Sequence, residues 1–200
     1  GDPGVRYPVL SLLIPAGVSV PRRFANLHFQ LEGHVTQALV LLFALLIGVV
    51  AGLRALTPPA VVAWGAKLGW LPLVGTWAEW VGNTITVTVL TVLLVVELIT
   101  DQLPKTPART VPSQFGARLL TGAFAGAVIG AGWHHTFIGM GAGMIGAVLG
   151  TMAGFHARRI LVARNGGRDL PVALAEDVLA VGGGFAVAAC VLSAIGPYVP

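Results

Sequence analysis

The chain has 200 residues, of which 56% are apolar and only 10% are charged. A soluble domain carries about 25% charged residues, so this composition excludes a disordered chain, a nucleic-acid-binding domain and an ordinary water-soluble enzyme. The formal net charge is +4, and the basic residues lie in short clusters between apolar runs, as in the loops of membrane proteins. The sequence therefore predicts a polytopic membrane protein of the all-α class, surrounded by the lipid bilayer.

Five apolar runs are long enough to cross a hydrocarbon core of about 30 Å, for which a helix needs about 20 residues. We expect membrane spans at Thr36–Leu53, Thr84–Thr100, Phe115–Trp133, Thr136–Phe155 and Leu170–Ile195. Residues 55–80 are apolar but interrupted by prolines and charges, which predicts a re-entrant or interfacial helix; a sixth span is the alternative. Residues 1–34 form an N-terminal extension with no assigned fold, and residues 35–200 form the transmembrane helical domain.

The distribution of Lys and Arg predicts the orientation of the spans. Five spans with a cytoplasmic N-terminus place ten basic residues inside and two, Arg54 and Lys67, outside. Six spans place eight inside and three outside, with Arg54 now inside and Lys67 within a span. The count therefore favours five spans, and both arrangements keep residues 101–118 and 156–169 in the cytoplasm.

Two spans carry glycine at every fourth position, namely Gly122, Gly126 and Gly130 in one and Gly146, Gly150 and Gly154 in the other. Residues four apart share a helix face, so each series predicts close helix packing, and we expect a homo-oligomer through these faces. Residues 48–55 also resemble residues 150–159, and a span with two acids follows each copy. Because the first and fourth spans cross the membrane in opposite directions in the five-span arrangement, this similarity predicts a weak inverted repeat.

Four acidic residues are candidates for coupling a proton or cation. Glu97 and Asp101 share one face at the end of a span, while Glu176 and Asp177 lie about 9–10 Å inside another. A carboxylate at the centre of a membrane helix costs roughly 2.5–3.5 kcal/mol, so such acids face the bundle, pair with a cation or bind a proton. Structural ion pairs with nearby arginines are the alternative interpretation.

Six basic residues are candidates for binding a small anionic solute or a lipid headgroup, because guanidinium groups pair bidentately with phosphate and carboxylate. They are Arg54, Lys105, Arg109, Arg118, Arg158 and Arg159. No nucleotide-binding, Ser/His/Asp or cysteine-based metal motif occurs, so the sequence predicts no cofactor, metal site or catalytic residue.

Three segments of the chain resemble a known family. They are Gly-Leu-Arg-Ala-Leu-Thr-Pro (52–58), Val-Glu-Leu-Ile-Thr-Asp-Gln-Leu-Pro-Lys-Thr-Pro-Ala-Arg-Thr (96–110), and Ala-Gly-Phe-His-Ala-Arg-Arg (153–159) followed by Ala-Leu-Ala-Glu-Asp (173–177). Over about residues 38–190 the chain resembles the bacterial membrane-protein family called domain of unknown function 4126. The resemblance implies a small helical protein of the bacterial inner membrane, and it supplies no site residues.

The residues themselves favour a small transporter or channel-like protein that moves an anionic solute or lipid headgroup and is coupled to a proton or cation. One alternative is a membrane-embedded, Mg-dependent enzyme acting on a lipid phosphate. Another is a structural subunit whose charges pair with one another.

Overall fold

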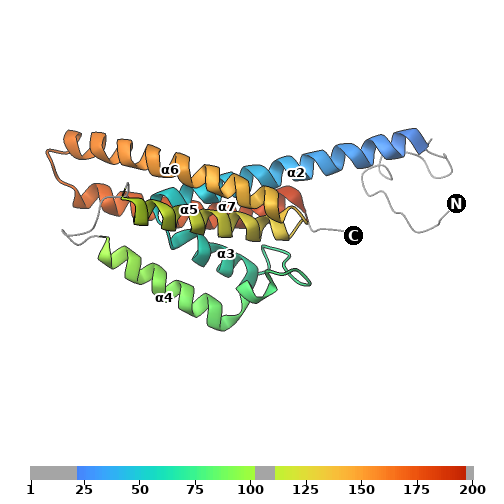
Figure 1. Ribbon diagram of the computed structural model, residues 1–200, viewed down its shortest axis with the longest axis horizontal. Coiled ribbons are helices and arrows are strands. Elements are labelled where there is room, and N and C mark those ends of the chain that lie inside the picture. Colours follow the sequence, from blue (N-terminus) through green and yellow to red (C-terminus); the bar gives the residue numbers. More distant parts are fainter. Residues whose placement is uncertain (1–21, 102–110, 197–200) are drawn as a thin grey trace. The chain divides into compact units, whose positions relative to one another are not determined.

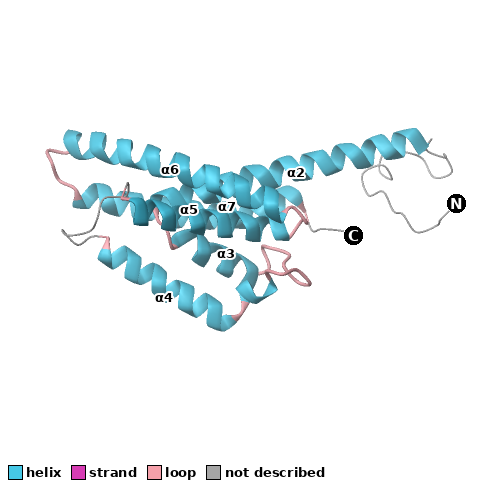
Figure 2. Cartoon of the chain, viewed as in Figure 1, coloured by secondary structure: helices cyan, strands magenta, loops and turns pink. Residues whose placement is uncertain are grey.

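The computed structural model describes residues 22–101 and 111–196, with side chains from residue 33 onward. The chain divides into two units, residues 1–35 and 36–200, and all that follows concerns the second. Every regular element in the described ranges is a helix, which confirms the all-α class (Figures 1 and 2). The elements are α2 (Arg22–Leu53), α3 (Thr57–Lys67), the 3₁₀ helix η1 (Glu79–Gly82), α4 (Thr84–Thr100), α5 (Pro112–Ala131), α6 (Thr136–Arg164) and α7 (Leu170–Ile195).

Three of the described helices are long and apolar enough to cross a membrane: the Gly33–Leu53 part of α2, α6 and α7. Helix α4 is apolar too, but it has only 17 residues. Large apolar side chains on these helices face outward, among them Ile85, Phe137 and Val178, each more than 70% exposed. An apolar surface of this kind suits lipid, so the chain is a membrane protein, while the count of five spans is not confirmed.

Glycines let the backbones of α2, α5 and α6 touch. A Cβ atom at Gly122, Gly126 or Gly130 of α5 would collide with the backbone or a Cβ of the segment formed by α6 and its preceding turn, and one at Gly146 or Gly150 of α6 would collide with α2. Both glycine series therefore pack against helices of the same chain, as close packing through small residues requires. The homo-oligomer predicted through these faces stays a prediction.

Helices α2 and α6 run in the same direction. Gly48 of α2 lies against Gly143 of α6, and Gly52, one turn later, lies against Thr151. An inverted repeat built on these two helices requires opposite directions, so the predicted repeat is not confirmed.

Helix α3 is short and almost wholly buried. Its 11 residues extend about 16 Å, which is half of what a membrane crossing needs. It packs against α4, α5, α7 and η1, and Val61, Val62 and Ala63 are fully buried. Residues 55–80 thus place a helix inside the bundle, where an interfacial helix would lie at its surface.

Candidate functional site

The candidate site is the break between α2 and α3. Helix α2 ends at Leu53 and α3 begins at Thr57, so the chain turns within three residues inside the protein. Each end of a helix leaves backbone groups without helical partners, and burial makes those groups costly. Pro58 and Pro59, in the first turn of α3, reduce this cost because proline has no N–H to satisfy. The remaining groups need partners from other helices.

Glu97 of α4 supplies the partners at the start of α3. The backbone N–H groups of Ala55 and Leu56 donate to its two carboxylate oxygens, at 2.7 and 2.9 Å. A carboxylate is favoured here because the N-terminus of a helix carries a partial positive charge. Glu97 therefore acts as a cap delivered from a different helix, and both of its oxygens are used.

Arg118 of α5 performs the matching task at the end of α2. Its Nη1 donates to the carbonyl oxygens of Gly52 and Leu53, both at 2.7 Å, and its side chain is buried. A cation is favoured beside the C-terminus of a helix, where the partial charge is negative. The guanidinium thus stabilises the broken helix, and the anion-binding role predicted for it competes with this contact.

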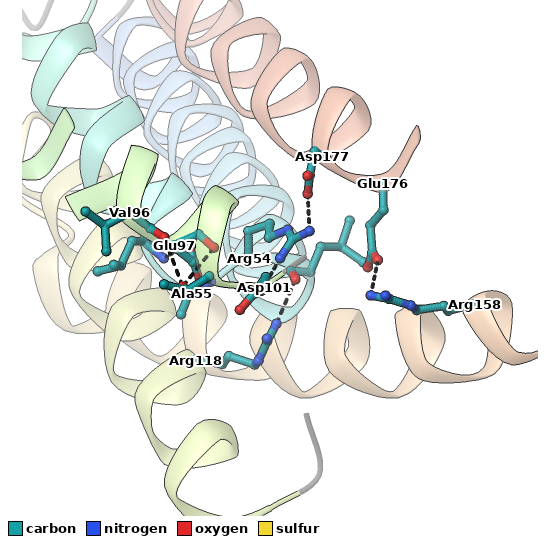
Figure 3. A network of polar contacts seen from close by, with 12 residues as sticks. Arg54, Ala55, Val96, Glu97, Asp101, Arg118, Arg158, Glu176 and Asp177 are labelled. Carbon is teal, nitrogen blue, oxygen red and sulfur yellow. Dashed lines mark hydrogen bonds and ion pairs between the residues drawn. The ribbon is translucent and has the colours of Figure 1, made fainter. Parts of the chain in front are cut away.

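Arg54, the first residue of the break, is fully buried and shared by two acids. It forms ion pairs with Asp101 at the end of α4 and with Asp177 in α7 (Figure 3). A buried cation requires such partners, because an unpaired charge in the protein interior is strongly destabilising. Two carboxylates for one guanidinium give these three side chains a formal charge of −1.

The Arg54–Asp101 ion pair corrects the predicted arrangement of the spans. Five spans place Arg54 outside and Asp101 in the cytoplasm, but the two side chains touch, so the ends of α2 and α4 lie on one side. The predicted placement of these two residues on opposite sides is therefore not met, because α3 and the segment after it carry the chain back between those helices. Lys67, which ends α3, donates to the hydroxyl of Thr84, which begins α4, at 2.8 Å. The six-span alternative places Arg54 and Asp101 on the same side.

A second set of ion pairs ties α7 to α6. Arg158 of α6 makes a bidentate contact with Asp169, at 2.9 and 2.7 Å, just before α7 begins. It also lies 3.5 Å from Glu176, the neighbour of Asp177 in α7. Two adjacent acids of α7 therefore bind two different arginines, one at the break after α2 and one in α6, as Figure 3 shows.

Seven of the predicted site residues meet in this region, namely Arg54, Glu97, Asp101, Arg118, Arg158, Glu176 and Asp177. Arg159 is exposed on α6, and Lys105 and Arg109 lie outside the described residues. Sequence reasoning missed Asp169, whose place eleven residues after Arg158, just before the Leu-Pro start of α7, was the available signal. It also missed Thr57, whose buried hydroxyl has no hydrogen-bond partner.

The charges of this described network do not balance. It contains five carboxylates, Glu97, Asp101, Asp169, Glu176 and Asp177, and three guanidinium groups, Arg54, Arg118 and Arg158. The carboxylates exceed the guanidinium groups by two. Ionisable groups gathered within membrane helices mark places where protons or cations can bind.

The opposite end of the bundle carries a pocket of about 460 Å³, lined in part by Trp77, His134 and His135. His134 has a backbone φ of +60°, in a turn between α5 and α6, and its side chain is exposed. Trp77 donates from its indole nitrogen to the hydroxyl of Thr136, at 3.1 Å. These residues have the amphipathic character of an interfacial turn.

Within the described ranges, no group of three or more His, Cys, Asp and Glu residues could hold a metal ion. No protein-family model matches the chain, and neither a curated protein nor a solved structure matches it. The resemblance to the domain of unknown function 4126 family therefore stays a prediction.

Proposed function

We propose that the protein is a small transporter of the bacterial inner membrane, driven by a proton or another cation. One observation carries this proposal: a buried arginine at a helix break is shared by aspartates from two other helices. Ionisable residues within membrane helices are costly, and they mark the pathways of ions and substrates. Broken helices occur in membranes where backbone is enclosed by protein or lines a cavity, and in many transporters they form the binding site.

The position of Arg54 between two aspartates supports the choice of a proton or cation as the coupling species. Protonation of one aspartate beside Arg54 would make that set of three side chains neutral, while the guanidinium would keep its other partner. The same step removes one of the two contacts that tie Arg54 to its neighbours. A proton can thus change which helices are linked, which is what a coupled transporter requires.

We propose an anionic solute or lipid headgroup as the cargo. Arg54, Arg118 and Arg158 already have partners within the chain. Of the predicted ligand arginines that are described, Arg159 is the exposed one, so a phosphate or carboxylate could reach it. The proposal also includes Lys105 and Arg109, the two predicted anion-binding residues that lie outside the described part of the chain.

We propose six passes with the ionic network at the cytoplasmic end. In this arrangement α2, α4 and α6 run toward the cytoplasm and α3, α5 and α7 return. The support is the meeting of Arg54, Asp101 and Asp177 at one end of the bundle. The excess of Lys and Arg in residues 101–118 and 156–169 supports the cytoplasmic side.

The test is proton-coupled flux in proteoliposomes that contain the purified chain and a pH-sensitive dye. A pH gradient should drive uptake of one class from a panel of phosphates, carboxylates and cations, and Asp177→Asn should lower that flux at least tenfold. Glu79→Gln is the matched control, because Glu79 is an exposed acid that bonds to the backbone of Gly75. Absence of flux from every class, with the folded chain present, would refute transport and favour the structural subunit. Flux that requires a divalent ion would reopen the enzyme alternative.

A further inference from the structure

The two halves of α7 are held in different ways. In the C-terminal half, Gly184 approaches Val61 of α3, Ala188 packs near Gly65, and Val191 is fully buried. This half therefore has apolar contacts with the buried helix α3.

The N-terminal half, residues 170–181, has only a narrow buried face made by Ala173, Asp177 and Ala180. Its large apolar side chains point away from the bundle, since Val178 is 72% exposed and Leu179 is 69% exposed. Small side chains bury little apolar area, so they contribute little to holding this half in place. The ion pairs of Asp177 with Arg54 and of Glu176 with Arg158 are therefore its main anchors.

Glycines separate the two halves. A Cβ atom at Gly182 or Gly183 would meet nothing within 4 Å, and neither residue has a positive φ. Neither packing nor backbone conformation therefore requires glycine there, although each glycine costs a helix about 0.8–1.0 kcal/mol relative to alanine. Helices bend readily at such positions, which gives the pair a role in flexibility.

Asp177 is the acid best placed to respond to a proton. Both oxygens of Glu97 accept backbone N–H groups at the break, so this side chain is engaged in holding the start of α3. Asp101 ends α4 with its side chain 19% exposed, and Glu176 shares Arg158 with the closer Asp169. The side chain of Asp177 is 11% exposed, and it contacts a fully buried arginine that a second aspartate shares.

We infer that Asp177 is the proton-binding carboxylate of the transporter and that its protonation frees residues 170–181 to pivot about Gly182 and Gly183. An O–H bond forms on the carboxylate with a proton from water, and Arg54 keeps its own proton and its pair with Asp101. The inference rests on the proposed function and deepens it, because it names the coupling ion and the moving element.

The other charged groups around Asp177 set the conditions for this step. Arg54, at the break after α2, pairs with Asp177 and also with Asp101 at the end of α4. Arg158 from α6 faces Glu176, the neighbour of Asp177. Helix α3 offers no charged side chain on this side, because its nearest polar group is Thr57. Once Asp177 is neutral, the N-terminal half has lost its ion pair with Arg54 and keeps the contact between Glu176 and Arg158.

Spin-label distances in the full chain test the inference. One pair of labels is attached at the exposed positions 160 in α6 and 174 in the N-terminal half of α7. A control pair is attached at the exposed positions 140 in α6 and 189 in the C-terminal half of α7. The exposed Cys190 is first replaced by alanine. Residues 170–181 form an arm of about 18 Å, so a tilt of roughly 15° moves its end by about 5 Å. We expect the 160–174 distance to shift by about 5 Å from neutral to acidic solution, with the control pair unchanged.

Three variants refine the test. Asp177→Asn should hold the 160–174 distance at its low-pH value at both pH values. The double variant Gly182→Ala/Gly183→Ala should at least halve the shift while it keeps or raises the thermal stability. Gly141→Ala on α6, where a Cβ atom also meets nothing within 4 Å, should leave the shift intact.

A constant 160–174 distance, or an equal change in both pairs, would overturn the inference. So would an undiminished shift in the double glycine variant. Flux is measured separately, which keeps the two proposals apart. Proton-coupled flux without a distance change would refute the pivot alone, and a distance change without flux would refute transport alone.

Discussion

The cap that Glu97 provides can be tested through stability. In Glu97→Gln, one carboxylate oxygen becomes an NH₂ group, so one of the N–H groups of Ala55 and Leu56 loses its acceptor and faces another donor. A buried donor without a partner costs about 1–3 kcal/mol, and the charge that favours the start of α3 is lost as well. For a chain of this size, each kcal/mol lowers the melting temperature by roughly 2–4 °C. We therefore expect a fall of roughly 2–12 °C.

The assay is thermal unfolding of the purified chain in detergent, followed by circular dichroism. Glu79→Gln is the matched control, because Glu79 accepts one backbone N–H from Gly75 in an exposed turn. Its loss should lower the melting temperature by about 2 °C or less, since exposed groups exchange their partner for water. Equal effects of the two substitutions would show that Glu97 does not cap a buried helix break.

Two further comparisons test the packing and the ion pairs. Gly146→Ala should destabilise the chain by about 1–3 kcal/mol, because its Cβ atom would collide with the backbone of α2. Gly141→Ala, where a Cβ atom meets nothing within 4 Å, should be neutral or slightly stabilising. Thermal unfolding measures both effects. Arg54→Ala should lower the free energy of unfolding by about 3–5 kcal/mol, because it leaves buried carboxylates without their cation. Arg158→Ala removes a partly exposed ion pair and should lower it by about 1 kcal/mol or less. Denaturant titration measures both values.

The helices could largely be predicted because residues close to each helix end determine where that helix begins or ends. Asn83 caps α4, and Pro171 stands in the first turn of α7, so the predicted bounds of both helices agree with the structure. Helix α6 continues to Arg164, beyond the predicted end at Phe155, because a helix can extend past its apolar stretch when its residues favour the helical state.

The number of passes was not predictable in the same way. Counting Lys and Arg in loops cannot tell whether residues 55–80 return across the bundle, because α3 is too short to read as a span. The contact that bears on it joins Arg54 and Asp101, which are 47 residues apart. The sequence identified both residues as candidates, yet their pairing depends on how α3 is enclosed.

The short helix α3 also bears on how the protein enters the membrane. Eleven residues with prolines at the second and third positions are too few to cross a membrane as a helix, so α3 depends on the helices that enclose it, among them α4 and α5. Arg54 is synthesised well before Asp101 and long before Asp177, and both of its ion pairs exist only when α7 has been made. Assembly of the buried network is therefore a late event in synthesis, and a chain that stops before α7 leaves Arg54 without one of its two aspartates.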